Sequence, residues 1–114
     1  MTSAHPHPDA KRVLYAEFTA VAGAEQSVVE LLRDYGERVR LEPGNITFAA
    51  YSKEADSRQI FVFEEYADED AFQTHLAAPY GRTFNLALAP LVDGGGSTLT
   101  FLSPHEGVAP HLTG

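Results

Sequence analysis

His75 is the residue of this 114-residue chain whose type and position best suit acid–base chemistry. It follows Phe72 by three positions, so in a helix both side chains would lie near the same apolar side. An imidazole titrates near neutral pH and can accept the proton of a phenol. We therefore predict a catalytic role for His75. The alternative is a structural histidine bonded to a carboxylate or to a backbone carbonyl.

Glu64 is the second candidate catalytic residue. It alternates with Ile60 and Val62, which places the three side chains on one face of a predicted strand. A carboxyl group among apolar neighbours needs a partner, and burial would raise its pKa. Glu64 could orient His75, exchange protons itself or form a structural ion pair. Glu65 has the opposite orientation, and a shift of register by one residue would exchange the two.

Aromatic and amide side chains near these two residues could bind a substrate. Aromatic residues in a small core usually only pack, and an asparagine after a glycine is often a turn residue. The candidates for substrate binding are Tyr51, Tyr66, Phe72, Tyr80, Phe84, Asn45, Arg82 and Asn85. The last two follow Pro79 and could close the pocket.

Composition argues against several other classes of function. The net charge of −8 disfavours a nucleic acid or an anionic membrane as partner, and no apolar run is long enough to span a bilayer. The chain has no cysteine, which suits a cytoplasmic protein, and none of its five histidines pairs with another at helical spacing. A phosphate-binding glycine loop is also missing. We expect no metal, flavin or haem cofactor.

The hydrophobic pattern predicts the elements that position these residues. Strands are predicted at residues 12–19, 45–52, 58–66 and 97–102, and helices at 24–41, 69–78 and 80–91. Pro43-Gly44 ends the first helix, Asp68 is a predicted N-cap, and Pro79 separates the later helices. The order β-α-β-β-α-β predicts an α+β, ferredoxin-like fold with an antiparallel four-stranded sheet. This domain is expected over residues 12–103, with flexible tails at 1–11 and 104–114.

The third predicted strand begins apolar on both faces. Ile60 and Val62 lie on one face, and Phe61 and Phe63 lie on the other. The helices of the chain can cover one face only, whereas a sheet with a solvated face would alternate with polar residues. We therefore expect a homodimer.

Two segments resemble the antibiotic biosynthesis monooxygenase family. The first is Glu42-Pro43-Gly44-Asn45, which is similar to that family's turn into its second strand. The second is the pattern Glu64-x-Tyr66-x-Asp68-x-x-Ala71-Phe72-x-x-His75, followed by Tyr80 and Phe84. The resemblance covers about residues 12–102. It implies a dimeric α+β barrel with a pocket between the helices and the sheet of each subunit.

The resemblance also implies a choice of activities. Some members of the family oxidise phenols or quinols with molecular oxygen and no metal or flavin, and others degrade haem. Haem-degrading members use an asparagine on the first strand, a tryptophan and a histidine. This chain has no tryptophan at all, and residues 12–19 contain no asparagine. We therefore predict a cofactor-independent monooxygenase acting on a small aromatic or quinol-type substrate. A non-catalytic small-molecule binder and an isomerase of a small hydroxyketone are the alternatives.

Overall fold

The computed structural model describes residues 10–105, 107 and 108. Its strands are β1 (Arg12–Thr19), β2 (Asn45–Ser52), β3 (Gln59–Tyr66) and β4 (Thr98–Leu102). Its α-helices are α1 (Glu25–Arg40), α2 (Glu69–Ala77) and α3 (Pro79–Leu88). The predicted tails lie mostly outside the described residues and stay predictions.

The four strands form one antiparallel sheet in the order β2-β3-β1-β4. The two central strands pair along their whole length, with Leu14 opposite Glu64. A bulge between Asn45 and Thr47 shifts the register of β2 against β3. The predicted α+β, ferredoxin-like arrangement is therefore confirmed.

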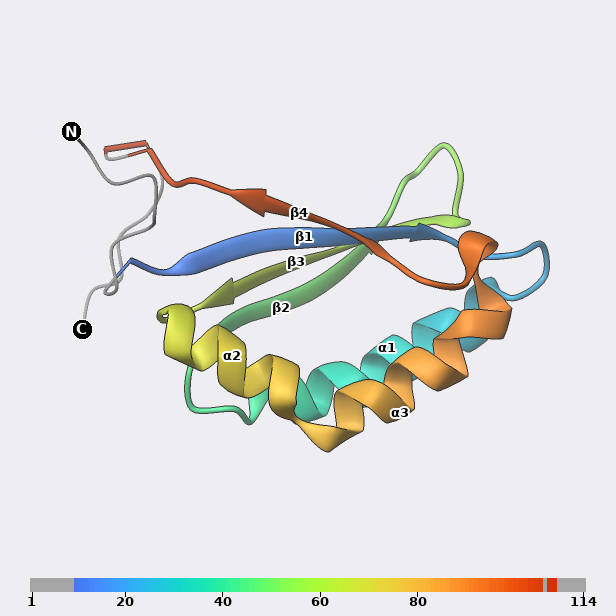
Figure 1. Ribbon diagram of the computed structural model, residues 1–114. Coiled ribbons are helices and arrows are strands. Elements are labelled where there is room, and N and C mark those ends of the chain that lie inside the picture. The colour runs from blue at the N-terminus through green and yellow to red at the C-terminus, as the bar shows by residue number, and fades with distance from the viewer. Residues whose placement is uncertain (1–9, 106, 109–114) are drawn as a thin grey trace.

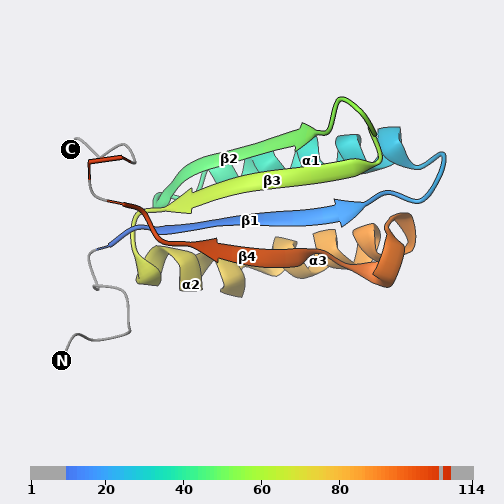
Figure 2. The ribbon, with the colours of Figure 1, turned by 90° about the horizontal axis from the view of Figure 1, so that it is seen from above.

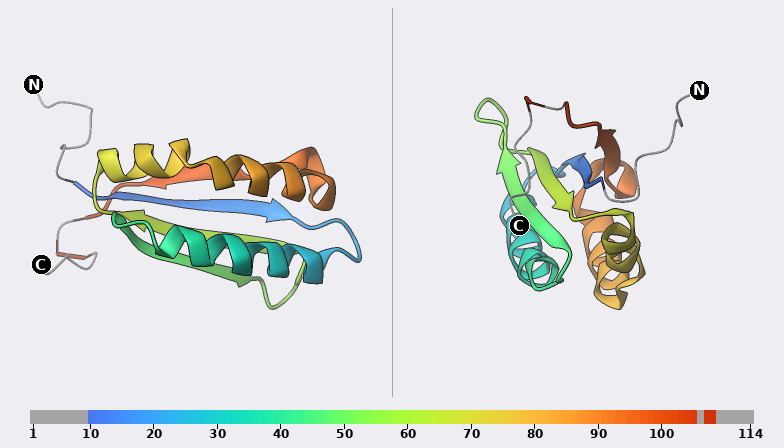
Figure 3. Two further views of the ribbon diagram at one scale, coloured as in Figure 1. Left: turned by 90° about the horizontal axis from the view of Figure 1, so that it is seen from below. Right: turned by 90° about the vertical axis from the view of Figure 1, so that its left-hand side faces the viewer.

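All three helices lie against the same face of the sheet (Figures 1 and 3). The strands supply alternate residues to this covered face, and α1 adds a stripe of apolar side chains at helical spacing. The core contains Leu14, Ala16, Phe18, Val28, Leu32, Val39, Phe48, Ile60, Val62, Tyr66, Phe72, Leu88 and Val92. Figure 2 looks onto the other face, which no helix covers.

The helical hairpin after β3 follows the predicted signals with one correction. The Asp68 side chain accepts a hydrogen bond from the Ala71 amide at 2.7 Å, which caps α2. Pro79 begins α3 because a proline is tolerated at the first helical position. The prediction that this helix continues to residue 91 is wrong. The α-helix ends at Leu88, and 3₁₀ turns follow at Ala89–Leu91 and Asp93–Gly95.

The turn between α1 and β2 lies directly against α2. A Cβ atom added to Gly44 would overlap the Cβ atom of Ala71, so only glycine allows this approach. The backbone also ties this turn to the segment between β3 and α2, because the Ala67 amide donates to the Gly44 carbonyl at 2.8 Å. This packing brings the end of α1 to the C-terminal half of α2, where the candidate site lies.

No helix among the described residues is long and apolar enough to cross a membrane.

Candidate functional site

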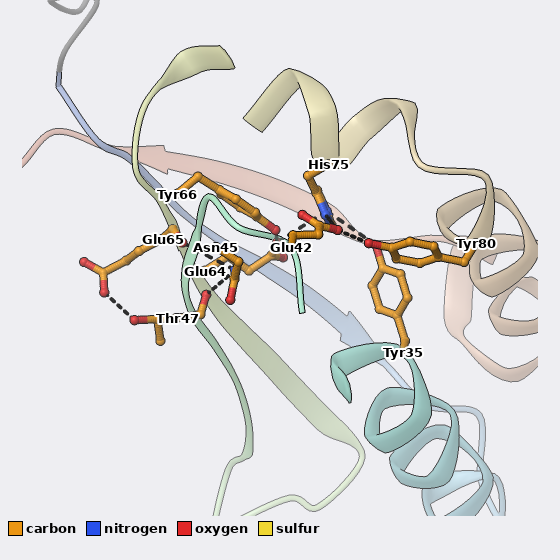
Figure 4. A network of polar contacts seen from close by, with 9 residues as sticks. All are labelled: Tyr35, Glu42, Asn45, Thr47, Glu64, Glu65, Tyr66, His75 and Tyr80. Carbon is orange, nitrogen blue, oxygen red and sulfur yellow. Dashed lines mark hydrogen bonds and ion pairs between the residues drawn. The ribbon is translucent and has the colours of Figure 1, made fainter. Parts of the chain in front are cut away.

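His75 lies in the last turn of α2 and points toward the sheet (Figure 4). The residue is only 8% exposed. Its Nδ1 atom lies 3.0 Å from Oε2 of Glu42. A carboxylate only accepts hydrogen bonds, so this contact assigns the donor role to Nδ1 and leaves Nε2 as the nitrogen that can accept. The pair is thus a carboxylate-held imidazole whose other nitrogen can act as a base.

Glu42 comes from the turn after α1 and holds two side chains with one oxygen. Its Oε2 atom accepts hydrogen bonds from His75 and from the hydroxyl of Tyr80. Burial and this bond to Glu42 together raise the pKa of Tyr80 to about 12, so the phenol stays a donor at neutral pH. The other oxygen, Oε1, is buried and has no hydrogen-bond partner in the described part of the chain.

The Nε2 side of His75 faces a second carboxyl group and two tyrosines. Tyr35 on α1 places its hydroxyl 3.4 Å from Nε2, and Oε1 of Glu64 lies 3.8 Å away. The Tyr66 hydroxyl donates to that same Glu64 oxygen at 2.6 Å. Side chains from α1 and β3 therefore converge on Nε2 of His75 in α2.

Burial sets the protonation of this group. It raises the pKa of Glu64, and the nearby charge of Glu42 adds to the effect, although the Tyr66 hydrogen bond and His75 oppose it. Burial also raises the pKa values of Tyr35 and Tyr66, and the Glu64 charge reinforces both shifts. Both phenols therefore remain protonated donors, while Glu64 is easier to protonate than an ordinary glutamate.

A cavity of about 130 Å³ lies beside His75 and Glu64, between the sheet and the helices. Most of its wall is apolar and comes from the core. Its lining also includes Leu76, Asn85, Ser97 and Leu99, which are exposed and form the mouth between α2, α3 and β4. Its lining includes Glu64 and His75, the two residues that the sequence predicted as catalytic, together with Tyr35.

The structure brings most of the predicted site residues together. Glu64 rather than Glu65 faces the cavity, because Glu65 lies on the open face and binds Lys11 and Thr47 at 2.8 and 2.6 Å. Phe72 and Phe84 line the cavity, and Asn85 lies at its mouth. Tyr66 and Tyr80 join through hydrogen bonds to the two glutamates. Their catalytic and binding roles stay predictions.

Three predicted binding residues lie elsewhere. Tyr51 is on the open face, opposite Phe61, and is 64% exposed, so it does not line this cavity, and its binding role stays a prediction. The Asn45 amide donates to the backbone carbonyls of Thr47 and Glu65 and so supports the bulge in β2. The ligand-binding role of Asn45 stays a prediction. Arg82 is exposed on α3 and is not among the residues that line the cavity, and its role in closing a pocket stays a prediction.

Glu42 and Tyr35 are the site residues that sequence reasoning missed. Glu42 stood in the turn that carried the family resemblance, and that turn was the available signal. Tyr35 belongs to the apolar stripe of α1. Its ring stacks on Phe84, and only its hydroxyl group, close to His75 Nε2, departs from the apolar pattern.

The described residues contain no group of three or more histidines, aspartates or glutamates placed to hold a metal ion.

The sheet order, the helical layer and the buried carboxylate–histidine group define a ferredoxin-like α+β protein with an internal polar site. A model of the family described as "Antibiotic biosynthesis monooxygenase" matches residues 12–85. This chain therefore belongs to the antibiotic biosynthesis monooxygenase family. No curated protein matches it significantly.

Solved structures share the fold at low sequence identity. PA3566 from Pseudomonas aeruginosa is 20% identical with a TM-score of 0.77, and the match covers 88% of this chain and 99% of that one. Rv0793 from Mycobacterium tuberculosis is 19% identical with a TM-score of 0.78, covering 88% and 100%. SO0527 from Shewanella oneidensis is 20% identical with a TM-score of 0.74, covering 82% and 90%.

Proposed function

We propose that this protein is a cofactor-independent monooxygenase that oxidises a small aromatic, quinol-type substrate. One observation carries the proposal: Glu42 holds Nδ1 of His75, while Nε2 lies among cavity-lining residues, 3.8 Å from Glu64. This arrangement suits a general base that takes a proton from a bound hydroxyl group. Membership of the family, whose name denotes monooxygenases, supports the reaction class.

The reaction needs only the substrate and molecular oxygen. His75 Nε2 would take the proton of a phenolic hydroxyl group, and Glu42 would stabilise the resulting imidazolium. The phenolate then passes one electron to oxygen, and the phenoxyl radical and superoxide combine in a carbon–oxygen bond. The peroxide anion formed in this way takes back a proton from the His75 imidazolium. The resulting hydroperoxide loses water, so an aromatic C–H bond becomes a quinone carbonyl and the second oxygen atom leaves as water.

Two features of the cavity fit such a substrate. Its volume of about 130 Å³ is close to the roughly 150 Å³ of an engineered apolar cavity that holds one benzene molecule. Its wall is mainly apolar, and its acid–base groups lie together on one side. The ring of a bound phenol would therefore contact the apolar wall, while its hydroxyl group would lie next to His75.

The test is oxygen uptake with a panel of hydroquinones and hydroxyarenes, without added flavin or metal. His75→Gln should lower kcat/KM about 100-fold or more, the usual contribution of a general base. Glu65→Gln, on the opposite face of the sheet, is the control and should keep its activity. Ligand binding with no oxygen uptake for any substrate would refute the oxygenase and leave a small-molecule binder.

We further propose that two copies of the chain pair through the open faces of their sheets. That face carries the aromatic residues Tyr15, Phe61 and Phe63, with the rings of Tyr15 and Phe61 6.2 Å apart. All three helices lie on the other side (Figure 2). A second copy would offer an equal apolar surface by symmetry, and a stable interface of this kind buries about 1,600 Å² in total.

Light scattering tests the pairing. The protein should have the mass of a dimer at micromolar concentration, and Phe63→Asp should shift it to the monomer. Leu86→Asp is the matched control, because Leu86 is 65% exposed on α3, away from the open face. A monomer mass for the unsubstituted protein would contradict the proposal.

A further inference from the structure

The rings of Tyr35 and Phe84 form the wall between the internal cavity and a groove outside it. They stack with their centroids 4.1 Å apart and their planes within 8° of parallel. Both residues line the 130 Å³ cavity, and both also line a groove of about 480 Å³ between α1 and α3. The two spaces are thus separated by one layer of aromatic side chains.

The outer groove is a continuation of the aromatic surroundings of the site. Its walls include Leu31, Pro79 and the ring of Tyr80, whose hydroxyl binds Glu42. Its rim is polar, with Arg38 placed 5.8 Å from the centre of the Tyr80 ring. This groove has more than three times the volume of the cavity beside His75.

We propose that Phe84 is the residue that limits the site to ligands with a single aromatic ring. Because of the stack, a second fused ring has no room behind the first. A second ring that left by the mouth, at Leu76 and Leu99, would stay in water and gain little apolar contact. This inference rests on one part of the proposed function, namely that the ligand binds in the cavity beside His75.

The two members of the stack differ in how firmly they are held. The Tyr35 hydroxyl lies 3.4 Å from His75 Nε2, so this ring is tied to the polar group. Phe84 has no polar atom and is held by packing alone. Removal of the Phe84 ring would join the cavity to the groove and leave the hydrogen bonds of Glu42, Glu64 and His75 in place.

Phenol and 2-naphthol are suitable probes, because they differ by one fused ring and their binding can be titrated without oxygen. The unsubstituted protein should bind phenol at least tenfold more tightly than 2-naphthol. Phe84→Ala should raise the affinity for 2-naphthol at least tenfold relative to the affinity for phenol. Thr83→Ala, a neighbour that lines only the outer groove, should change neither.

Phe84→Leu provides a second variant in case the alanine variant does not fold, and its gain should be smaller but in the same direction. If phenol binds and neither variant improves 2-naphthol binding, the size limit is overturned while the proposed function stands. Equal affinity of the unsubstituted protein for phenol and 2-naphthol would also overturn the size limit and leave the proposed function standing. If phenol binds but no variant takes up oxygen, the proposed oxygenase activity is refuted. The size limit is then still decided by whether the Phe84 variants bind 2-naphthol more tightly. No phenol binding at all would overturn both.

Discussion

Glu42→Gln should weaken both the stability and the activity of this protein, because one Glu42 oxygen holds both His75 and Tyr80. The side chain is only 11% exposed, so solvent replaces little of what is lost. Hydrogen bonds to charged groups contribute about 1.5–3 kcal/mol, and neutral ones about 0.5–1.5 kcal/mol. Glutamine keeps the shape and an acceptor oxygen but not the charge. With two bonds affected, we expect the free energy of unfolding to fall by about 2–3 kcal/mol.

The effect on turnover has a separate cause. Once His75 has taken a proton, the imidazolium loses the stabilisation of the Glu42 carboxylate. A loss of about 2 kcal/mol in the transition state corresponds to a fall of roughly 30-fold in kcat/KM. Urea unfolding measures the first effect, and oxygen uptake under conditions where the variant is fully folded measures the second.

Glu65→Gln is the matched control for this experiment. Glu65 is also a carboxylate with two donors, Lys11 and Thr47, and these hydrogen bonds lower its pKa although burial alone would raise it. Its substitution should cost stability but leave turnover within about twofold, provided that the dimer mass is unchanged. If Glu42→Gln destabilises the fold yet keeps full activity, Glu42 is only structural and the reasoning is wrong.

Two further predictions concern groups next to the site. The pKa of Glu64 is raised by burial above its ordinary value of 4.5, so the folded protein holds a proton that the unfolded chain releases. The free energy of unfolding should therefore fall as pH rises from about 4.5 through the raised pKa, and Glu64→Gln should remove that part of the fall. The measurement is the free energy of unfolding in urea at pH values between roughly 4 and 8 for both proteins. If this free energy changes with pH in the same way in both, the prediction about Glu64 is contradicted. Gly44→Ala should cost about 1–3 kcal/mol by overlap with Ala71, and adding Ala71→Gly should restore part of it. Additive losses in the double variant would show that the overlap is not the cause.

The fold was predictable because its signals are local. Alternation in β3 placed Ile60, Val62 and Glu64 on one face, and all three are buried in the structure. The Asp68 cap and the proline at 79 marked the ends of α2 and α3. The overestimated length of α3 has a local cause too. The apolar spacing continues to Leu91, but Pro90 lacks an amide hydrogen, and the chain turns into a 3₁₀ helix.

The site was predictable only where a local pattern carried it. Glu64 and His75 each stood out by position within one element. Glu42 meets His75 across 33 residues of sequence, and the close approach of Gly44 to Ala71 makes that meeting possible. A contact between residues so far apart leaves no repeating pattern in the sequence from which it could be predicted. The position of Tyr51 outside the cavity has a related reason. Its strand is an edge strand, and the register against β3 decides which face Tyr51 joins.

The alternatives first weighed for His75, a base or a structural histidine, do not exclude each other in this structure. Its ring lies 4.8 Å from that of Tyr66, and its nitrogens approach Glu42 and Tyr35. Removing the whole ring would leave the buried Glu42 carboxylate with one donor fewer, which is costly whatever the protein does. A loss of activity in His75→Ala therefore could not separate chemistry from structure. Glutamine retains a donor for Glu42 but cannot act as a base, so His75→Gln separates the two.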